Sequence, residues 1–389
     1  MTDASPSHPR SAARERIEAL SDPGTFFELD AVPGRPDDGV VAGVATIDGR
    51  DVALYAAGDA GAAAARIVKV RDLALRSRIP VIGLEDGGAP PGGDLPALAG
   101  RADVLQRMVR ASGVIPQIAV AAGPHPGPAA ALADFVLTIA GTGCQAHFTA
   151  GDEAGCWLDV RRLLSYLPAN NGESPPFAAT ADPGDRVEPE LQTLAGAAAT
   201  YDVDDVIARV LDDGGFLEAQ AGVALNLVAG FGRLGGHAVG VMANQPATQS
   251  GAIDAAAEAK AARFVRTCDA FNVPLVTLVD TSGLGTDGHG TRLAYAYAKA
   301  TVPKLTVILR RAPGDAYGVM APRPLGADLV LAWPGAEVAG ADVYAAAERG
   351  YVDDVIEPRE TRRALVRGLE LCLRKDVDRP ARKHGNIPL

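Results

Sequence analysis

Two stretches of the chain repeat one pattern of apolar and polar positions. Each consists of an amphipathic helix, a proline-led turn, a short apolar strand and a glycine-containing exit. The second stretch, residues 261–283, includes ARFVRTCDAFNVPLVTLVDTSG, and the first, residues 66–88, is RIVKVRDLALRSRIPVIGLEDGG. The expected strands, Val81 to Leu84 and Leu275 to Val279, are too short and too apolar for exposed elements, so we predict that both are buried. A glycine after a buried strand lets the backbone approach a ligand closely.

The rest of the chain repeats in the same order around these two stretches. Each half opens with a short helix and an extended segment, in which Asp22 and Phe26 correspond to Asp212 and Phe216. Hairpin signals follow at Asp48-Gly49 and Gly235-Gly236. Later strands are predicted in matching pairs, at Gln117 to Ala121 and Lys304 to Leu309, and at Ala133 to Leu137 and Ala327 to Leu331. This ordered series of pairs indicates a tandem duplication.

The duplication predicts two domains of α/β class. Helices alternate with strands in each half, so each half should form a sheet covered by helices. Residues 168–190 are rich in Pro, Gly and small polar residues and are expected to be a linker. The predicted domains are therefore residues 1–167 and 191–389, and 389 residues are too many for one ordinary core.

Composition excludes some classes of partner. The net charge of −11 argues against nucleic acid or an anionic membrane as the main partner. No apolar run is long enough to span a bilayer, and the N-terminal segment has no apolar run of the kind that a signal peptide carries. Aromatic residues make up only 5% of the chain against 48% hydrophobic residues, which predicts closely approaching elements rather than an aromatic core.

The four cysteines carry no paired spacing. Cys144, Cys156, Cys268 and Cys372 lie far apart, which fits a reducing cytoplasm better than a disulfide scaffold. Cys144, His147 and Cys156 match no common zinc pattern, so we expect no metal site. Cys268 lies on the apolar side of its helix and is expected in the core.

Nearly the whole chain resembles one family, the carboxyltransferase subunits of biotin-dependent acyl-CoA carboxylases of the propionyl- and acetyl-CoA type. The stretches that carry the resemblance are ARERIEALSDPGTFFELD, VVAGVATIDGR, GFGRLGGHAVGVMANQP, ARFVRTCDAFNVPLVTLVDTSG, LAYAYAKATVPK, AAERGYVDDVIEPRETR and RPARKHGNIPL. The resemblance implies tandem crotonase-like domains of the ClpP/crotonase ββα superhelix type. Family membership does not by itself establish activity.

The resemblance also implies a reaction. Carboxybiotin, on a partner carrier protein, releases CO₂, the biotin ureido nitrogen removes the acyl-CoA α-proton, and the enolate captures CO₂. The protein then supplies mainly two oxyanion holes of backbone N–H groups, worth roughly 3–4 kcal/mol for each donor. The implied partners are an acyl-CoA or other acyl thioester, a biotin carboxylase or biotin carrier subunit, and further copies of this chain in a homodimer or larger homo-oligomer.

The holes can be assigned to this chain position by position. The first matches Gly87, Gly88 and Ala89, although the serine that precedes these residues in the family is lost. The second matches Gly314, Asp315 and Ala316, where Asp315 replaces a glycine of the family's Tyr-Gly-Gly-Ala-Tyr. The residues expected to bind substrate are Gly127, Gly283, His289, Tyr317 and Gly318.

Asp315 has three interpretations of equal weight. Its carboxylate disfavours a developing negative charge, or it is a new acid or base, or it faces solvent on a re-routed loop. His289 is likewise an acid or base or, with better odds in its glycine-rich loop, an exposed residue. Arg310, Arg311 and Lys299 either meet CoA phosphates or, more simply, lie on a solvated face.

Other departures from the family lie near its substrate. Residues 58–65 replace a Phe- and Gly-containing block, Pro90-Pro91-Gly92-Gly93 replaces an Arg-rich continuation, 125–129 replaces Ala-Gly-Gly-Ala, and a helical segment is missing between Ala339 and Ala345. Three functions stay open as a result. They are a working carboxyltransferase, a biotin-independent acyl-thioester enzyme such as a decarboxylase or acyltransferase, and a silent subunit that assembles with an active paralogue.

Overall fold

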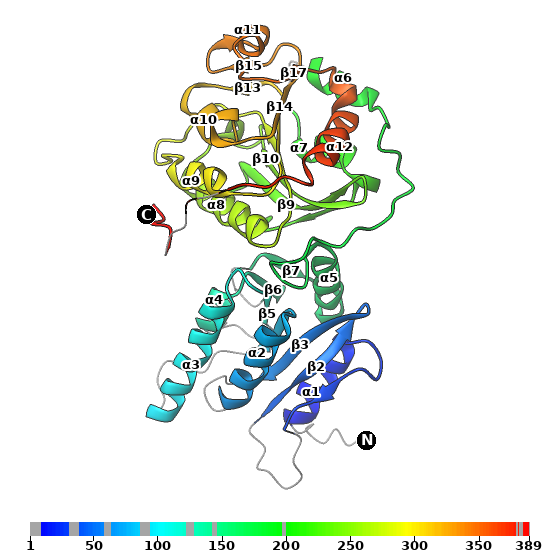
Figure 1. The fold of residues 1–389 in the computed structure, drawn as a ribbon, viewed down its shortest axis with the longest axis vertical. Helices are drawn as coiled ribbons and strands as arrows, with labels where there is room; N and C mark the ends of the chain where they lie inside the picture. Colours follow the sequence, from blue (N-terminus) through cyan, green and yellow to red (C-terminus); the bar gives the residue numbers. More distant parts are fainter. Residues whose placement is uncertain are drawn as a thin grey trace. The chain divides into compact units, whose positions relative to one another are not determined.

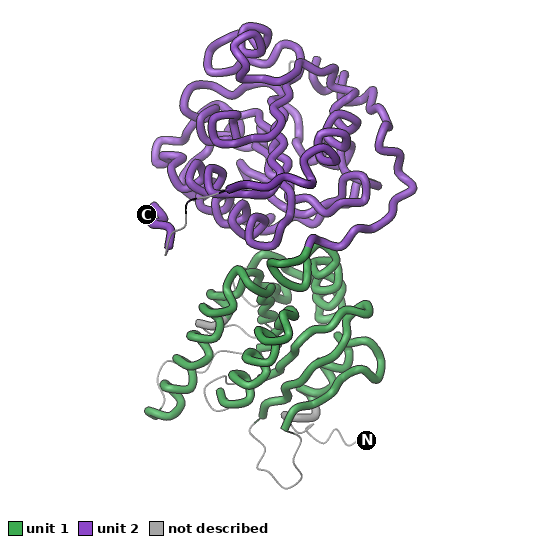
Figure 2. The backbone as a smooth tube through the Cα atoms, viewed as in Figure 1, with its two compact units in different colours: residues 1–173 green, residues 174–389 purple. Residues whose placement is uncertain are grey.

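The computed structural model describes residues 9–30, 39–57, 64–85, 94–121, 128–141, 146–196, 200–378, 380 and 384–388. It divides into two compact units, residues 1–173 and 174–389 (Figure 2). Each unit contains one seven-stranded sheet with helices packed against it (Figure 1).

The sheet of unit 1 follows the chain order, β1-β2-β3-β4-β5-β6-β7. β1, β2 and β3 are antiparallel, and β3 to β7 run parallel. The strands are β1 Phe27–Glu28, β2 Val40–Ile47, β3 Arg50–Ala57, β4 Val81–Glu85, β5 Gln117–Ala121, β6 Phe135–Ile139 and β7 Phe148–Ala150. The helices are α1 Pro9–Leu20, α2 Ala64–Ser77, α3 Leu95–Ala111, α4 Pro128–Leu132 and α5 Glu153–Tyr166.

The sheet of unit 2 has the corresponding order, β17-β14-β12-β11-β10-β9-β8. Its strands are β8 Phe216–Glu218, β9 Leu227–Leu234, β10 His237–Asn244, β11 Leu275–Val279, β12 Lys304–Ile308, β14 Leu329–Ala332 and β17 Asp354–Val355. A small sheet adds β13 Arg311–Ala312, β15 Glu337–Val338 and β16 Ala341–Asp342. The helices are α6 Pro189–Gly196, α7 Val203–Val210, α8 Ala255–Ala270, α9 Thr291–Lys299, α10 Gly314–Val319, α11 Val343–Glu348 and α12 Thr361–Cys372, with 3₁₀ turns at Asp212–Gly214, Gln249–Gly251, Arg323–Leu325 and Pro358–Glu360.

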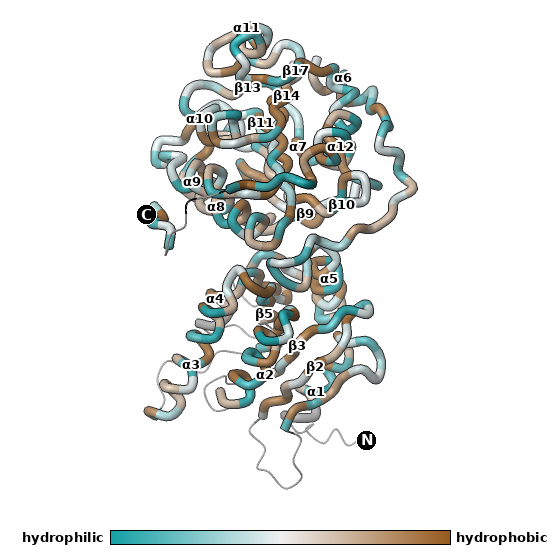
Figure 3. The backbone as a smooth tube through the Cα atoms, viewed as in Figure 1, coloured by the Kyte–Doolittle hydropathy of each residue, from teal (hydrophilic) through white to brown (hydrophobic). Residues whose placement is uncertain are grey.

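The predicted strands form at or within one or two residues of the expected bounds. β11 and β5 match them, β4 is one residue longer than predicted, and β12 is one residue shorter. Every residue of these four strands is buried, because parallel strands are covered on both faces. Apolar residues accordingly gather along the strands of both sheets (Figure 3).

The two hairpins close with the turns that their sequences predict. Asp48 and Gly49 connect β2 to β3 with φ of 49° and 73°, and Gly235 and Gly236 connect β9 to β10 with φ of 59° and 81°. Positive φ at both central residues is the type I′ geometry, whose twist matches that of the flanking strands. The turn residues therefore set the register of each hairpin.

Each hairpin turn is held by one carboxylate from the preceding segment. Asp22 accepts from the N–H groups of Asp48 (3.0 Å) and Gly49 (2.8 Å). Asp212 accepts in the same way from Gly235 (2.9 Å) and Gly236 (2.7 Å). The Gly49 N–H and then the Thr46 hydroxyl lower the pKa of Asp22 to about 2.

An arginine from the last helix of each half completes this interaction. In unit 1, Arg161 of α5 pairs with Asp22 (3.4 Å) and donates to the Leu20 carbonyl (2.7 Å). In unit 2, Arg362 of α12 pairs with Asp212 (2.7 Å) and donates to the Val210 carbonyl (2.7 Å). The contact in unit 2 is the more buried, since Arg362 is 0% exposed. The duplication is thus visible in matching hydrogen bonds as well as in the sequence.

The segment expected to be a linker makes contacts at several points, although most of its residues are exposed or only partly buried. Asn170 accepts from the Arg78 guanidinium of unit 1 (2.9 Å). Farther along, Phe177 stacks edge-on against His237 (5.0 Å between ring centroids), and Asp182 pairs with Arg186 (2.7 Å), both within unit 2. Its Pro- and Gly-rich composition corresponds to backbone without a regular helix or strand up to the start of α6. Among the helices that the structure describes, none has both the length and the apolar character needed to cross a membrane.

We expect Asp212→Ala to destabilise unit 2 far more than Asp22→Ala destabilises unit 1. The first substitution removes the nearer carboxylate of the fully buried Arg362 and leaves only Asp182, at 3.5 Å, so we expect a loss toward the lower end of the about 3–5 kcal/mol that breaking a buried ion pair typically costs. Each unit contains one tryptophan, Trp157 or Trp333, so urea unfolding followed by fluorescence in Trp157→Phe and Trp333→Phe backgrounds reports each unit separately. Equal losses in the two units would contradict the prediction.

Candidate functional site

Two loops meet at the carboxyl edge of the unit 2 sheet. One follows β11 and consists of Asp280-Thr281-Ser282-Gly283, and the other follows β12 and leads through β13 into α10 (Figure 1). The Thr281 N–H donates to the Arg311 carbonyl (2.9 Å), and the Asp280 carboxylate pairs with the Arg311 guanidinium (3.3 Å). Carboxyl ends of parallel strands are the usual ligand-binding edge of α/β sheets.

A buried polar group supports these loops from below. Asp280 is 1% exposed, and it acts with burial to raise the pKa of Tyr201. The Arg310 guanidinium lies 4.6 Å from the centre of the Tyr201 ring and donates to the Leu194 carbonyl (2.6 Å). Arg310 is therefore engaged within the chain, whereas the sequence suggested either phosphate contacts or a solvated face. Arg311 is exposed, as expected for a solvated face, while it pairs with Asp280.

Gly283 has a backbone that favours glycine. Its φ is 130°, a region that residues with a side chain rarely adopt. Its N–H donates to the Thr281 hydroxyl (3.0 Å), and its carbonyl accepts from the Ile253 N–H (3.0 Å). The N–H of Gly283 is thus used to shape the loop, which argues for a structural role at this expected substrate-binding position.

The start of α10 presents two backbone donors. Gly314 has φ of 47° and is exposed, as is Asp315. The Ala316 N–H donates to the Pro313 carbonyl (3.1 Å), whereas within the described part of the chain the Gly314 and Asp315 N–H groups meet no acceptor. The first N–H groups of a helix have no partner inside it and point outward. Of the three residues expected to form the second hole, Gly314 and Asp315 therefore carry the available donors.

The Asp315 side chain faces solvent in the isolated chain. It lies in the first turn of α10, where a carboxylate interacts favourably with the free N–H groups of the helix. This placement fits the solvent-facing interpretation and brings a negative charge to the rim of the donor pair. Gly318, four residues after Gly314, is exposed on the same helix.

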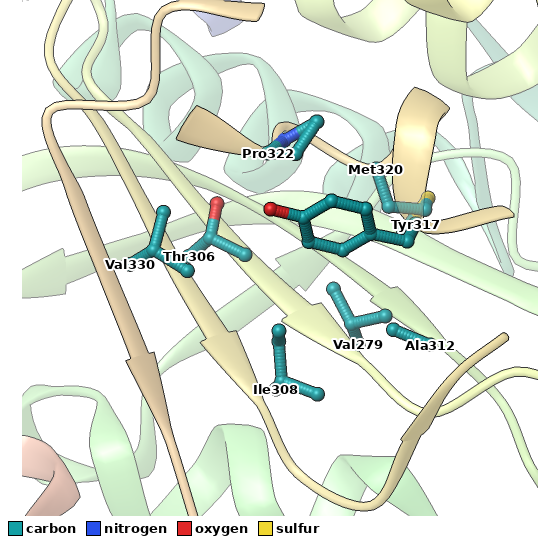
Figure 4. Close-up of a pocket in the computed structure, with 8 residues that line it drawn as sticks. All are labelled: Val279, Thr306, Ile308, Ala312, Tyr317, Met320, Pro322 and Val330. Carbon is teal, nitrogen blue, oxygen red and sulfur yellow. The ribbon is translucent and has the colours of Figure 1, made fainter. Parts of the chain in front are cut away.

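Tyr317 anchors α10 to the sheet. Its ring covers a narrow apolar pocket, which has no room for a water molecule (Figure 4). The pocket is lined by Val279, Thr306, Ile308, Ala312, Met320, Pro322 and Val330, together with Tyr317 itself. The hydroxyl donates to the Tyr351 carbonyl (3.4 Å), and burial, then Tyr351 and Asp353, raises its pKa. Tyr317 therefore fixes the height of the donor pair above the strand ends.

His289 is exposed in the loop before α9. Its N–H donates to the buried Glu258 carboxylate (3.3 Å), which also accepts from the Arg292 N–H (2.7 Å). This carboxylate from α8 caps the first turn of α9, so the loop is held by Glu258 while the imidazole stays at the surface.

The first expected hole lies outside the described residues. Gly87, Gly88, Ala89 and Gly127 all fall in undescribed stretches, so their roles stay predictions. The described residue nearest to this hole is Glu85, a buried carboxyl group at the end of β4 that the predicted strand bounds excluded. Comparing the halves could have revealed it, because Val279 occupies its position in the second half.

A family segment is expected to be missing between Ala339 and Ala345, and the chain forms a tight hairpin turn there. β15 and β16 form a hairpin whose turn is Ala339-Gly340, with φ of 49° and 81°. Elsewhere, the Val136 N–H donates to His147 Nδ1 (3.0 Å), so this nitrogen serves the backbone rather than a metal. Among the described residues no cluster of His, Cys, Asp and Glu suits a metal ion.

Comparison with known proteins gives a consistent result along the whole chain. The model of the carboxyl transferase domain family matches residues 6–145, 136–340 and 340–387. The chain is 38% identical to a propionyl-CoA carboxylase carboxyltransferase subunit of Haloferax mediterranei, over 98% of this chain and 94% of the relative. It is 37% identical to the methylmalonyl-CoA decarboxylase subunit alpha of Veillonella parvula, over 98% of this chain and 93% of that protein.

A solved structure shows the same fold. The chain superimposes on transcarboxylase 12S, a hexamer with hydrolysed methylmalonyl-coenzyme A bound, with a TM-score of 0.91 and 36% identity. The match covers 97% of this chain and 92% of that chain. The tandem crotonase-like fold expected from the sequence is thereby confirmed.

Internal segments are missing relative to these proteins. The alignment with the Haloferax mediterranei subunit spans 483 positions, whereas this chain has 389 residues, so at least 94 positions have no counterpart here. One break in the family match falls at residue 340, in the turn of the β15–β16 hairpin.

We expect Gly314→Ala to destabilise unit 2 by about 1 kcal/mol and Gly318→Ala to be neutral or stabilising. A Cβ meets no atom within 4 Å at either position, but only Gly314 has a positive φ, which penalises a side chain. The two variants of one helix therefore separate backbone strain from crowding. Urea unfolding followed by Trp333 fluorescence measures both, and equal effects would count against the left-handed conformation at Gly314.

Proposed function

The chain belongs to the carboxyl transferase domain family, and we propose that it transfers a carboxyl group between biotin and an acyl-CoA. The observation that carries this proposal is the extent of the likeness, which covers 98% of the chain and hence both halves. The similar proteins are named for propionyl-CoA carboxylase and methylmalonyl-CoA decarboxylase. A short-chain acyl-CoA is accordingly the substrate that we propose.

The donor pair at α10 fits an oxygen that gains negative charge. The N–H groups of Gly314 and Asp315 are exposed and free of acceptors within the described part of the chain, and Tyr317 holds their helix on the strand ends. Such donors stabilise a developing oxyanion without having to reorganise. An enolate oxygen of the thioester and a ureido oxygen of biotin both suit this geometry.

When bound, biotin supplies the carboxyl group and a ureido nitrogen that takes the α-proton of the acyl-CoA. The chain's own contribution is to bind the thioester, exclude water and hold the oxygen on which charge appears. Gly314 and Asp315 form one hole, and Gly87, Gly88 and Ala89 form the other. Backbone donors perform this role without a catalytic side chain, in keeping with the absence of a Ser-His-Asp pattern in the sequence.

The proposed assembly contains more than one copy of the chain and a biotin carrier. A transcarboxylase 12S hexamer shares the fold, and a similar protein is named as a subunit of a biotin-dependent carboxylase. We propose a homodimer or a larger ring built from dimers. Cys156, Cys268 and Cys372 are free thiols, which fits a proposed location in the reducing cytoplasm.

A second candidate function rests on Asp315. A carboxylate beside the donor pair suits an acid or base, so a biotin-independent acyl-thioester enzyme is the alternative. A silent subunit would bind neither biotin nor acyl-CoA on its own.

Purified protein is expected to decarboxylate methylmalonyl- or malonyl-CoA only when biotin is added. Free biotin replaces the carrier and accepts the carboxyl group, which is the reverse half-reaction of a carboxyltransferase. Mass spectrometry of the thioesters, with and without biotin, measures it. Turnover without biotin would overturn the proposal in favour of the alternative, and binding of neither ligand by calorimetry would indicate a silent subunit.

Asp315→Gly is expected to raise biotin-dependent turnover two- to fivefold. The substitution removes a negative charge from the rim of the hole. An exposed charge near a helix start changes the energy of a nearby charge by up to about 1 kcal/mol, which corresponds to a severalfold change in rate. Asp315→Asn is the matched control, because it removes the charge but keeps a side chain of similar size. The added backbone freedom of glycine is therefore absent from this variant. A loss of tenfold or more in both variants would instead identify Asp315 as an acid or base.

A further inference from the structure

A cluster of ionisable side chains is buried in unit 1 and ends with Glu85 at the carboxyl edge of the sheet. Glu85 is the last residue of β4, Tyr55 lies on the neighbouring β3, and Arg71 comes from α2. They are 7%, 1% and 5% exposed. The proposed transfer of a carboxyl group uses none of these side chains directly.

Tyr55 links the positive and the negative group. Its hydroxyl accepts from Arg71 Nη2 (2.8 Å) and donates to Glu85 Oε1 (3.1 Å). The guanidinium lies 5.2 Å from the centre of the Tyr55 ring, and its Nη1 donates to Gln117 Oε1 on β5 (3.0 Å). The groups that face Glu85 therefore come from β3 and α2, and Gln117 of β5 holds the guanidinium.

The strand is built to admit this contact. Gly83 stands opposite Tyr55 in the register of β3 and β4. A Cβ at position 83 would lie 2.3 Å from the Tyr55 hydroxyl oxygen, so any side chain there would push the hydroxyl away from Glu85. The missing side chain at Gly83 is what lets the Tyr55 ring lie across the strand.

The second half of the chain serves as an internal control. The Ala53 N–H donates to the Pro80 carbonyl (2.9 Å), and the Gly240 N–H donates to the Pro274 carbonyl (2.8 Å), which fixes the correspondence of the two sheets. By this correspondence and the ungapped alignment of residues 66–88 with 260–282, the counterparts of Tyr55, Arg71 and Glu85 are Met242, Val265 and Val279, all of them buried. The fold itself therefore has no need of ionisable groups at these positions.

Burying such groups costs stability. Well-packed apolar residues in place of a buried ion pair are often neutral or stabilising, so an ionisable cluster at a strand end points to function rather than to folding. Burial raises the pKa of Glu85, against the opposing effects of the Tyr55 hydrogen bond and then Arg71. Burial also raises the pKa of Tyr55 to about 12, so the Tyr55 hydroxyl keeps its proton at neutral pH.

Ionisation of Glu85 decides how the hydrogen bonds run. An ionised carboxylate accepts the Tyr55 proton, as the geometry has it. A protonated carboxyl group brings its own proton to the same contact, and the Tyr55 hydroxyl must then turn its proton elsewhere. The two protonation states therefore differ in how the end of β4 is held against β3 and α2.

We propose that Glu85 is a positioning residue for carboxyl transfer: linked through Tyr55 to Arg71, it holds the carboxyl end of β4 in the arrangement that receives the thioester. The proposal rests on the proposed function for its catalytic part. β4 corresponds to β11 of unit 2, whose carboxyl end carries the Gly283 loop beside the α10 donors.

Glu85→Gln separates positioning from structure. The amide still accepts from Tyr55 but cannot ionise, and we expect kcat to fall about tenfold to a hundredfold, the range of a small misplacement, while KM changes less. The pH dependence of kcat should lose the limb that Glu85 titration causes. Tyr55→Phe should reproduce both effects, because it removes the link. Activity within twofold of the parent at every pH would overturn the proposal.

A positioning role and a merely structural role predict opposite effects of Glu85→Gln on the stability of the protein. Because the pKa of Glu85 is raised on folding, the parent protein should lose stability as pH rises through that pKa, and Glu85→Gln should not. At neutral pH the variant should thus be as stable as the parent or more so. Arg50→Met is the matched control, since Arg50 is a partly buried arginine at the opposite end of β3 that donates to the Leu167 carbonyl (2.8 Å). Glu85→Gln losing stability as Arg50→Met does would indicate a merely structural group.

A triple variant guards against a misfolded single variant. Tyr55→Met, Arg71→Val and Glu85→Val together give unit 1 the residues of unit 2, and this protein should fold and lose turnover. A fully active triple variant would overturn the proposal.

Amide exchange tests the inference when the proposed function itself fails. Exchange of residues 53–57, 81–85 and 117–121, corrected for its intrinsic pH dependence, should change as pH rises through the raised pKa of Glu85 in the parent and stay constant in Glu85→Gln. If the parent shows no biotin-dependent turnover but shows this linkage, the proposed function fails and the coupling at β4 stands. If neither protein shows the linkage, the proposal is overturned whatever the turnover.

Discussion

One carboxylate in each half holds together elements that are far apart in the sequence. Asp22 and Asp212 receive the N–H groups of a hairpin turn, and an arginine from the last helix of the half binds each carboxylate. The first segment, the hairpin and the closing helix thus share one point, and the parallel strands between them keep their order. Because removal of either partner would leave a buried charge or turn donors without acceptors, this interaction tolerates little change. Its presence in both halves accounts for the matching strand order of the two sheets.

The ends of the corresponding strands differ in how they use polar groups. In unit 2 the residues below the site are mostly apolar, and Asp280 and Tyr201 serve to hold two loops together. In unit 1 the corresponding strand end carries Glu85, with Tyr55 and Arg71 beneath it. A duplicated fold permits this divergence, because the other copy has apolar residues at the positions of Tyr55, Arg71 and Glu85. The difference between the halves is therefore more informative than either half alone.

The sequence predicted the strands well because buried parallel strands are short apolar runs, and because Asp-Gly and Gly-Gly steps allow few turn types. The sequence predicted the contacts of long side chains poorly. Arg310 looks solvated in the sequence, but its cation lies over Tyr201, a residue more than one hundred positions away. Residues 168–190 look like a linker in the sequence, and only the structure gives the contacts of Asn170 with Arg78 and of Phe177 with His237. Composition reports backbone irregularity, whereas the partner of a long side chain depends on tertiary contacts that no local pattern encodes.

The loss of internal segments bears on the chemistry in a specific way. At least 94 aligned positions are missing, and the one break in the family match within unit 2 falls in a tight hairpin. This hairpin lies beside β13, the strand that leads into α10, because the Ala339 N–H donates to the Ala312 carbonyl (2.9 Å). Gly314 keeps its left-handed backbone there, and Tyr317 keeps the helix seated on β11, β12 and β14. A site made of backbone N–H groups depends on the path of the chain and on the packing beneath it, not on which side chain projects from the loop. Replacement of a glycine by Asp315 therefore changes the field at the rim but leaves the donors in place, which is why the charge of this residue, rather than its backbone, is the variable that separates the candidate functions.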